Sequence, residues 1–333
     1  MKILLYSEAM RLIRISGLGR AVLHQKRALA QCGIPCTTDP KEEHDIVHIN
    51  TLGIRSKRLA RSAKKQGKAV VYHAHSTQED FRNSFLGSNL ILAPYKKWIC
   101  SCYAQGDVIV TPTEYSKSLL KGYGIDKPIY AVSNGIELES YRPLDSDREE
   151  FRSRYGFSET DKVVMSVGLY FERKGILDFV RLAYAMPDHK FIWFGKTPLI
   201  SVPAKIRRAV RTKLPNLIFA GYVPPEELKK AYVGSDVYIF PTYEETEGIV
   251  LLEALAAHAD VIVRDIPVFG YLKDGTDCYK ARSLSEFKYR IGALTSGRLP
   301  SLSEAGYDAV RGKDLRNIGK QLGEIYASVR AYT

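Results

Sequence analysis

The chain has 333 residues, of which 45% are hydrophobic and 26% are charged, a balance typical of soluble globular proteins. This is about twice the length of a usual domain, so we expect two domains. No run of about 18 apolar residues is present, and the N-terminal segment is too short and too soon acidic for a signal peptide. The five cysteines have neither disulfide nor zinc spacing, as expected of a cytoplasmic protein with reduced thiols.

The net charge of +12 is unevenly distributed along the chain. Residues 1–135 hold 20 Lys and Arg against 10 Asp and Glu, a net charge of +10, which leaves +2 for the remainder. A basic half indicates an anionic partner, such as a membrane surface, a nucleic acid or a phosphorylated ligand, although a soluble protein can simply be basic. No RNA-binding signature or zinc finger is present, so we expect no nucleic-acid partner.

Strand-like and helix-like segments alternate along almost the whole chain. Continuous Val- and Ile-rich strands joined by helices predict an α/β fold, with two doubly wound, Rossmann-like parallel-sheet domains facing a cleft. The polar, charged segment 138–161 is a candidate interdomain linker. The expected strands are 2–6, 45–50, 69–73, 107–111, 129–132, 162–168, 190–194, 217–220, 237–240 and 261–263, and the expected helices include 20–31, 176–186, 226–233 and 249–257.

A glycine-containing loop precedes the first expected helix. Gly17 and Gly19 match only part of a dinucleotide fingerprint, because Val22 stands where a third glycine would be and the first strand ends too far away. Asp39 follows about twenty residues later, as in an NAD site. The loop could bind NAD, approach a phosphate or sugar, or be a simple turn, and the pattern favours the second role over the first.

Residues 54–68 form a strongly basic segment with a thin apolar stripe, a pattern typical of a helix lying on an anionic lipid surface. The apolar and aromatic segment 81–103, which includes Trp98 beside Lys96 and Lys97, suits a membrane interface, although core packing explains it equally well. Residues 205–213 form a weaker second basic segment. The basic side chains of the first segment are Arg55, Lys57, Arg58, Arg61, Lys64, Lys65 and Lys68.

His73 and His75 lie at the end of an expected buried strand, on the same side of it. Two histidines at this spacing can bind a metal ion, but no third ligand is evident nearby, so we expect none. His75, at the tip of the strand, is expected to form a hydrogen bond with a ligand hydroxyl. A purely structural role is the alternative, and more so for His73.

Arg173 and Lys174 stand between an expected strand and the start of the next helix. The helix dipole disfavours cations at a helix N-terminus, so their position suggests an anionic ligand, and a diphosphate would fit. A solvated surface pair is the alternative.

The acidic loop that begins at residue 241 follows an expected strand and continues into an apolar helix. The N-terminus of this helix offers unpaired N–H groups and a positive dipole, which favour an anion. The carboxylates of Glu245 and Glu253 can each accept hydrogen bonds from several hydroxyls. Together these groups predict a site for a sugar nucleotide.

With the Glu245-x7-Glu253 motif, the segment Ser133-Asn134-Gly135 and the pair Lys174-Gly175, the chain resembles retaining glycosyltransferases of family four, which adopt the GT-B fold. The resemblance covers essentially the full length. It implies that Glu253 binds the ribose hydroxyls and that Glu245 holds the donor sugar.

The resemblance also implies roles for the other candidate residues. His75 should contact the sugar from the other domain, and Lys174 should neutralise the diphosphate. Family members usually carry an arginine where this chain has Leu169, and Arg173 is the expected replacement. The family's glycine pair is Ile266-Pro267 here. The remaining donor-binding positions are Thr246, Glu247, Gly248, Ile249, Gly17, Gly19 and Asn134.

The segments 75–83, 171–175 and 264–267 are similar to a bacterial subgroup that glycosylates glucosyl-diacylglycerol. This implies transfer of a hexose from UDP-glucose or UDP-galactose to monoglucosyl-diacylglycerol, with the anomeric configuration retained and an α-linked diglycosyl-diacylglycerol as product. No metal or other cofactor is expected. The enzyme would be cytoplasmic and attached peripherally to the inner face of the cell membrane.

The same resemblance divides the chain into two functional parts. Residues 1–140 would bind the acceptor and the membrane, residues 141–314 would bind the nucleotide sugar, and a C-terminal helix at about 315–333 would pack back on the first part. Three alternatives are a family-four enzyme with a soluble or polysaccharide acceptor, a non-catalytic peripheral membrane protein, and a hydrolase that uses the two carboxylates as acid and base.

Overall fold

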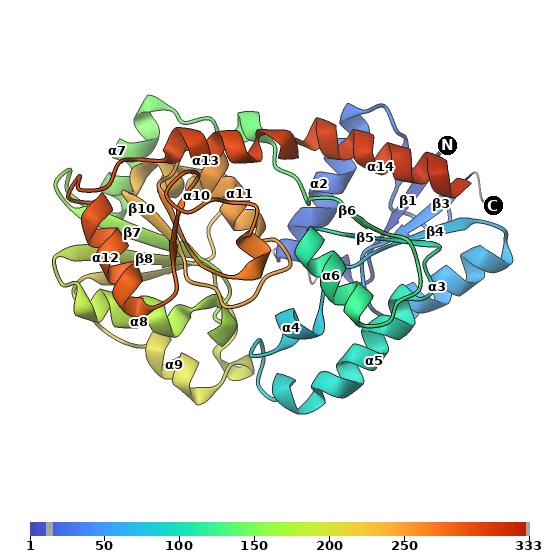
Figure 1. Cartoon of the computed structure of the whole chain (residues 1–333), viewed down its shortest axis with the longest axis horizontal. Helices are drawn as coiled ribbons and strands as arrows, with labels where there is room; N and C mark the ends of the chain where they lie inside the picture. The colour runs from blue at the N-terminus through green and yellow to red at the C-terminus, as the bar shows by residue number, and fades with distance from the viewer. Residues whose placement is uncertain (11–15, 331–333) are drawn as a thin grey trace.

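The computed structural model describes residues 1–10 and 16–330, which form two parallel six-stranded sheets, each with helices on both faces (Figure 1). The predicted α/β fold with two doubly wound sheets is confirmed. All ten strands expected from the sequence are present, and two short edge strands, β2 and β12, were not expected. Edge strands of two or three residues carry too little periodicity to be recognised in a sequence.

The first sheet has the order β2-β1-β3-β4-β5-β6. Its strands are β1 (Ile3–Tyr6), β2 (Cys36–Thr37), β3 (Ile46–Ile49), β4 (Ala69–His73), β5 (Val108–Thr111) and β6 (Ile129–Ala131). Helices α2 (Gly17–Gln31) and α14 (Leu315–Arg330) cover one face, and α3 (Ile54–Lys65), α5 (Leu92–Tyr103) and α6 (Glu114–Gly122) cover the other. The short helices α4 (Gln78–Phe81) and η1 (Ser88–Ile91) follow β4.

The second sheet has the order β12-β11-β10-β7-β8-β9. Its strands are β7 (Lys162–Val167), β8 (His189–Phe194), β9 (Leu217–Gly221), β10 (Val237–Phe240), β11 (Val261–Arg264) and β12 (Tyr279–Ala281). One face packs on α7 (Asp145–Tyr155), α10 (Pro225–Gly234) and α11 (Ile249–Ala256), and the other on α8 (Ile176–Ala185), α9 (Ala204–Val210) and α12 (Leu284–Leu294). The remaining helices are α13 (Ser303–Val310), η2 (Leu138–Tyr141), η3 (Glu172–Lys174), η4 (Leu199–Ser201), η5 (Pro267–Phe269) and η6 (Arg311–Lys313).

The segment 138–161, expected as a linker, instead contains η2 and α7. Phe151 and Phe157 give this polar segment an apolar side, and both are buried in the core beneath the second sheet. Phe151 lies within α7 and Phe157 follows its end. Much of this candidate linker therefore packs on the second sheet.

The chain crosses between the sheets twice, and the two crossings run side by side. The N–H of Ile136 donates to the Lys313 carbonyl at 3.0 Å, and the N–H of Leu315 donates to the Ile136 carbonyl at 3.2 Å. After the second crossing, α14 returns along α2 (Figure 1) and buries its apolar stripe in the core of the first sheet. A Cβ at Gly319 would lie 2.2 Å from the Ala28 carbonyl, so glycine permits this close packing. Residues 331–333 of the expected C-terminal helix lie outside the described residues.

Candidate active site

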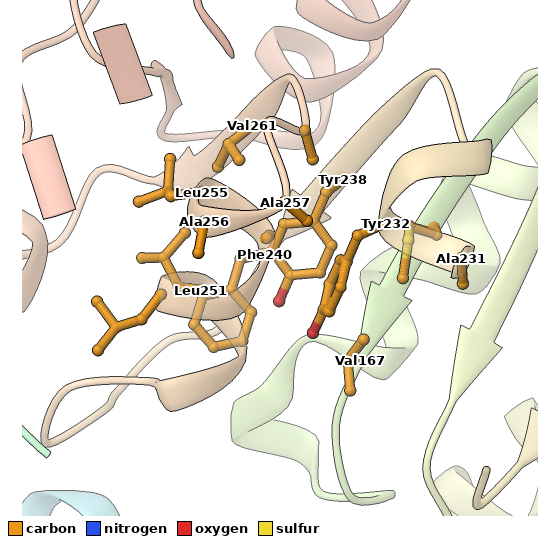
Figure 2. Close-up of a cluster of buried hydrophobic side chains, with 14 of the residues drawn as sticks. Val167, Ala231, Tyr232, Tyr238, Phe240, Leu251, Leu255, Ala256, Ala257 and Val261 are labelled. Atoms are coloured by element: carbon orange, nitrogen blue, oxygen red, sulfur yellow. The ribbon is translucent and has the colours of Figure 1, made fainter. Parts of the chain in front are cut away.

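The acidic loop lies between β10 and α11, at the carboxyl end of the second sheet. Its foundation is an aromatic layer in which Tyr232, Tyr238 and Phe240 pack beside Leu251 (Figure 2). The rings of Tyr232 and Tyr238 meet edge to face at 5.5 Å. This packed layer holds the first turn of α11 and the loop before it in a defined position.

The N-terminus of α11 is not capped by a side chain. The N–H groups of Leu251 and Leu252 bond to the Gly248 carbonyl, whereas those of Gly248, Ile249 and Val250 have no acceptor among the described residues. Free N–H groups at a helix N-terminus favour an anionic ligand such as a phosphate. The predicted donor positions Thr246 to Ile249 therefore lie at a helix end that is open for binding.

Glu245 is buried beside two cations. Its Oε1 accepts hydrogen bonds from Lys174 Nζ and from Thr242 Oγ1, the latter at 2.9 Å, and Arg173 Nη1 lies 3.7 Å away. Its second oxygen, Oε2, has no partner among residues 1–10 and 16–330. That oxygen can accept a hydrogen bond from a ligand.

Lys174 reaches Glu245 because of the glycine that follows it. Gly175 has φ +77°, and a Cβ there would lie 2.3 Å from the Pro241 carbonyl, so only glycine lets the η3 turn pack against the acidic loop. Burial lowers the pKa of Lys174, and the nearby Glu245 carboxylate opposes that shift. The basic turn and the acidic loop, each predicted separately to bind the donor, lie against each other in the structure.

Arg173 links the two halves of the molecule. Its guanidinium forms an ion pair with Asp80 at 2.9 Å, donates to Ser84 Oγ through Nε at 2.8 Å, and donates to the Glu244 carbonyl at 3.0 Å. These contacts join the second sheet's loop to α4 and the turn after it. Arg173 is therefore placed to hold the two halves together, and the remaining N–H groups of its guanidinium can still donate to a ligand.

Glu253 is fully buried within α11 and is also shared between the two halves. Its Oε1 pairs with Arg20 from the first turn of α2, and Tyr232 donates to its Oε2 at 3.1 Å. Arg20 also lies 3.4 Å from the hydroxyl of Tyr141. A carboxylate has about four acceptor positions, so these contacts leave capacity for the hydroxyls of a ligand.

Gly17 and Gly19 lie in the first turn of α2, beside Arg20. Ser16 caps this helix, and its Oγ accepts from the N–H of Gly19 at 3.3 Å. An added Cβ at Gly17 would meet nothing within 4 Å, so the space beside this turn is open. The helix end of the first half thus lies next to Glu253 of the second through Arg20.

Glu247 and Asn134, both predicted to bind the donor, bind each other. Asn134 donates to Glu247 Oε2 through its backbone N–H and its side-chain amide, each at 2.8 Å, and Ser133 Oγ donates to Oε1. Lys313 Nζ lies 3.4 Å from Oε1, and Glu247 is fully buried. Glu247 therefore fastens the acidic loop to both chain crossings, which the sequence had not indicated.

His75 belongs to a column of neutral imidazoles. Its ring stacks on that of His73 at 4.0 Å, and His73 lies 3.1 Å from His48, which in turn contacts the hydroxyl of Tyr326 on α14 at 2.5 Å. Burial lowers the pKa of His75 to about 3, so its ring is neutral at physiological pH. Its Nε2 donates to Asn50 Oδ1 at 2.8 Å, which leaves Nδ1 as an acceptor.

The predicted membrane-binding residues lie on α3 and α5. Arg55, Arg58 and Lys65 are exposed and form no ion pair within the part of the chain that the structure describes. Three others have contacts: Lys57 lies over the Trp98 ring at 5.0 Å, Arg61 donates to Gln105 at 3.3 Å, and Lys64 pairs with Asp107 at 2.8 Å. Trp98 Nε1 donates to the Leu52 carbonyl at 2.8 Å, which fixes this ring at the edge of the first domain.

The chain is similar to proteins of known family. Residues 40–140 match the family description Glycosyltransferase Family 4, and residues 147–275 match Glycosyl transferases group 1. The chain is 40% identical over 331 residues to the Processive diacylglycerol alpha-glucosyltransferase of Acholeplasma laidlawii. The aligned region covers 99% of this chain and 98% of that relative. The chain belongs to glycosyltransferase family 4. The prediction that it is a glycosyltransferase enzyme is confirmed.

Other similarities agree with this assignment. The glycosyltransferase is 25% identical over 267 residues to the Alpha-galactosylglucosyldiacylglycerol synthase of Streptococcus pneumoniae, covering 78% of this chain and 71% of that one. Its structure resembles Anabaena HepE in complex with UDP and glucose, with a TM-score of 0.80 over 98% of this chain and all of that one, at 14% identity. It also resembles a Thermosynechococcus elongatus sucrose-phosphate synthase, with a TM-score of 0.79 over the full length of both at 16% identity. The predicted GT-B fold is confirmed.

The described residues contain neither a cluster of metal ligands nor a membrane-spanning helix. Among the described residues, no three His, Cys, Asp or Glu side chains gather as they would around a metal ion. No helix within these residues is both long and apolar enough to cross a membrane.

Sequence reasoning did not identify several residues that shape this site. Tyr232 contacts Glu253, Asp80 contacts Arg173, and Thr113 donates to the Thr246 carbonyl at 2.9 Å. Their partners lie far away in the sequence, so no local pattern connects them. Only the neighbouring charges and hydroxyls in segment 75–83, already noted for its resemblance, could have suggested Asp80.

Proposed function

We propose that the enzyme transfers glucose from UDP-glucose to monoglucosyl-diacylglycerol and forms an α-linked diglycosyl-diacylglycerol with retention of configuration. The observation that carries this proposal is the pair Glu245 and Glu253 on either side of the open N-terminus of α11. The 40% identical diacylglycerol glucosyltransferase supports the transfer of glucose and the lipid acceptor. UDP-galactose is the second donor to test, because a relative named for a galactosyl product is also similar.

The donor would lie between the two domains, with residues 141–314 supplying most of its contacts. The carboxylate of Glu253 would accept from the ribose hydroxyls, and the free oxygen of Glu245 would accept from a hydroxyl of the sugar. The diphosphate would accept from the N–H groups of Gly248, Ile249 and Val250. The complex of UDP and glucose with a protein of the same fold is consistent with a donor of this class.

The transfer step would form a bond between the acceptor oxygen and the anomeric carbon as the bond from that carbon to the diphosphate breaks. Attack from the face that the diphosphate leaves would retain the configuration. The proton of the acceptor hydroxyl would pass to the departing diphosphate. Lys174 would stabilise the charge that develops there, because a buried ammonium interacts strongly with an anion in a site of low dielectric constant.

His75 would contact the transferred sugar from the first domain. Because its pKa is about 3, the imidazole would act as a neutral hydrogen-bonding group and not as a general acid. Arg173 would position the loop that carries Lys174 by means of Asp80 and Ser84.

The enzyme would need no metal, because Lys174 and the N-terminus of α11 would balance the diphosphate charge. Activity with saturating UDP-glucose should be unchanged after dialysis against EDTA. A strict requirement for added Mg²⁺ would contradict this part of the proposal.

Residues 1–140 would bind the acceptor and attach the enzyme to the inner face of the cell membrane. The exposed cations Arg55, Arg58 and Lys65 support this, because anionic lipids attract basic residues near the surface. Lys57, Arg61, Lys64 and Trp98 would complete the same surface.

One assay tests the function directly. The purified enzyme would be supplied with UDP-glucose or UDP-galactose and with vesicles that contain monoglucosyl-diacylglycerol, and the product would be identified by mass and NMR. We expect one added hexose from UDP-glucose in α linkage. Transfer only to a soluble glycoside or polysaccharide would contradict the lipid acceptor, and UDP binding without any transfer would indicate a non-catalytic protein.

A further inference from the structure

Residues 85–91, between α4 and α5, present apolar side chains to solvent. Leu86, Leu90 and Ile91 are 65%, 88% and 50% exposed. Three large aliphatic side chains on one short segment are unusual on a surface exposed to water. Contact with an apolar partner would remove them from water, which is favourable.

The second domain brings another exposed aliphatic residue to the same place. Ile200, in η4, is 84% exposed, and its neighbour Ser201 accepts a hydrogen bond at 3.1 Å from the N–H of Leu86. Phe85 also packs edge to face on Phe171 of the second domain at 4.7 Å. The segments that flank these loops, α5 and α9, both lie along the lower edge of the molecule in Figure 1.

A recess of about 210 Å³ opens at this junction, and both domains line it. Its lining includes Asn83, Phe85 and Gly87 from the first domain and Glu172, Pro203 and Lys205 from the second. The two loops therefore form one composite surface across the seam between the domains.

Exposed cations belong to the segments that flank these apolar residues. Arg82 and Lys97 come from the first domain, and Arg208 and Arg211 come from α9 and the residues after it. None of these four forms an ion pair with a residue that the structure describes. Exposed aliphatic residues flanked along the chain by exposed cations are complementary to a bilayer that contains anionic lipids, because the aliphatic tips can enter the interface while the cations meet the headgroups.

We propose that both domains contact an anionic bilayer, through one surface centred on Leu86, Leu90, Ile91 and Ile200. This rests on the proposed membrane attachment and extends it beyond the first domain. The two loops touch in this structure, so a bilayer that binds both of them should favour this arrangement of the domains. Because the donor would lie between the domains, UDP and the bilayer should each raise the affinity for the other by the same factor.

The first test is sedimentation with vesicles of phosphatidylglycerol and phosphatidylcholine that contain no glycolipid. Ile200→Asp should lower vesicle affinity by about tenfold or more, since it places an anion where an aliphatic side chain would enter the bilayer. Leu144→Asp is the matched control, because Leu144 is 58% exposed in the same domain and precedes α7, at the opposite edge of the molecule in Figure 1. It should bind like the wild type. Wild-type vesicle affinity in Ile200→Asp would overturn the proposal.

The second test measures UDP affinity by calorimetry with and without these vesicles. The wild type should bind UDP several-fold more tightly when vesicles are present, and Ile200→Asp should show a smaller gain at the same vesicle concentration while binding UDP as well as the wild type does without vesicles. Equal UDP affinity of the wild type with and without vesicles would overturn the link between bilayer and closure. Since no acceptor is present, a failure of the proposed transfer reaction would leave both measurements unaffected.

Discussion

The acidic loop with α11 and the basic helix α3 hold their charges in opposite ways. Glu245, Glu247 and Glu253 are buried, and each pairs with a cation or several hydrogen-bond donors. Arg58 and Lys65 are exposed and have no ion-pair partner among the described residues. Buried charges need defined partners, whereas exposed charges act through screened, additive attraction. The loop is therefore suited to recognising one ligand in one orientation, and the helix to recognising a kind of surface.

The largest effect is expected where a buried carboxylate faces the donor. Glu245→Gln should lower kcat by about 10²–10³-fold, comparable to the loss of one group that stabilises the transition state. Its neighbour Glu244 is the matched control, because Glu244→Gln makes the same chemical change one residue away and should keep kcat within about threefold. Circular dichroism would verify the fold of both. Equal kcat values for the two variants would contradict the proposal that Glu245 acts on the donor and Glu244 does not.

The fold and the acidic site could be predicted from the sequence to different degrees. The sheets were predictable because Val- and Ile-rich strands have a local signature. A motif indicated Glu245, Glu253 and Lys174, and their roles in binding the donor stay a prediction. The role of Glu247 was not, since its partners Ser133, Asn134 and Lys313 belong to chain crossings whose meeting depends on the whole fold.

The contacts of Arg173 with the other domain could not be predicted for a related reason. The sequence shows a cation at a helix start, but it does not show that Asp80 and Ser84 from the other domain reach it first. Spacing along a chain can indicate that a charge needs a partner. It cannot distinguish a ligand from a distant side chain.

A smaller, graded effect is expected on the basic helix. Each Lys or Arg near an anionic membrane contributes about 1 kcal/mol, so charge reversal of both Arg58 and Lys65 should weaken binding to anionic vesicles by about 30-fold or more. Reversal of Arg316 and Lys320, exposed residues of α14 on the other face of the first sheet, is the matched control and should change binding little. The difference should shrink at high salt. Equal losses in both double variants would indicate attraction by net charge alone.

The smallest effect concerns Glu244, a carboxyl whose surroundings are intermediate between those of the buried glutamates and those of the exposed cations. Burial raises its pKa to about 7, and the nearby carboxylates Asp80, Glu79 and Glu245 add to the shift, while the hydrogen bond from Tyr115 Oη at 3.1 Å opposes it. A raised carboxyl pKa means that the folded state binds the proton more tightly than the unfolded state. Stability should therefore fall as pH rises from about 4.5 to 7 and be constant above that range, so far as this group determines it.

Glu244→Gln should remove this dependence, because the amide stays neutral and can still accept from Tyr115. In thermal unfolding, the variant should match the wild type near pH 5 and exceed its Tm by a few degrees at pH 8, given roughly 2–4 °C per kcal/mol for a domain of this size. Glu226→Gln, at an exposed glutamate on α10, is the control and should shift Tm equally at both pH values. If Glu244→Gln also shifts Tm equally at both, the carboxyl is ionised throughout this range, and its environment resembles that of the exposed charges more than that of Glu245.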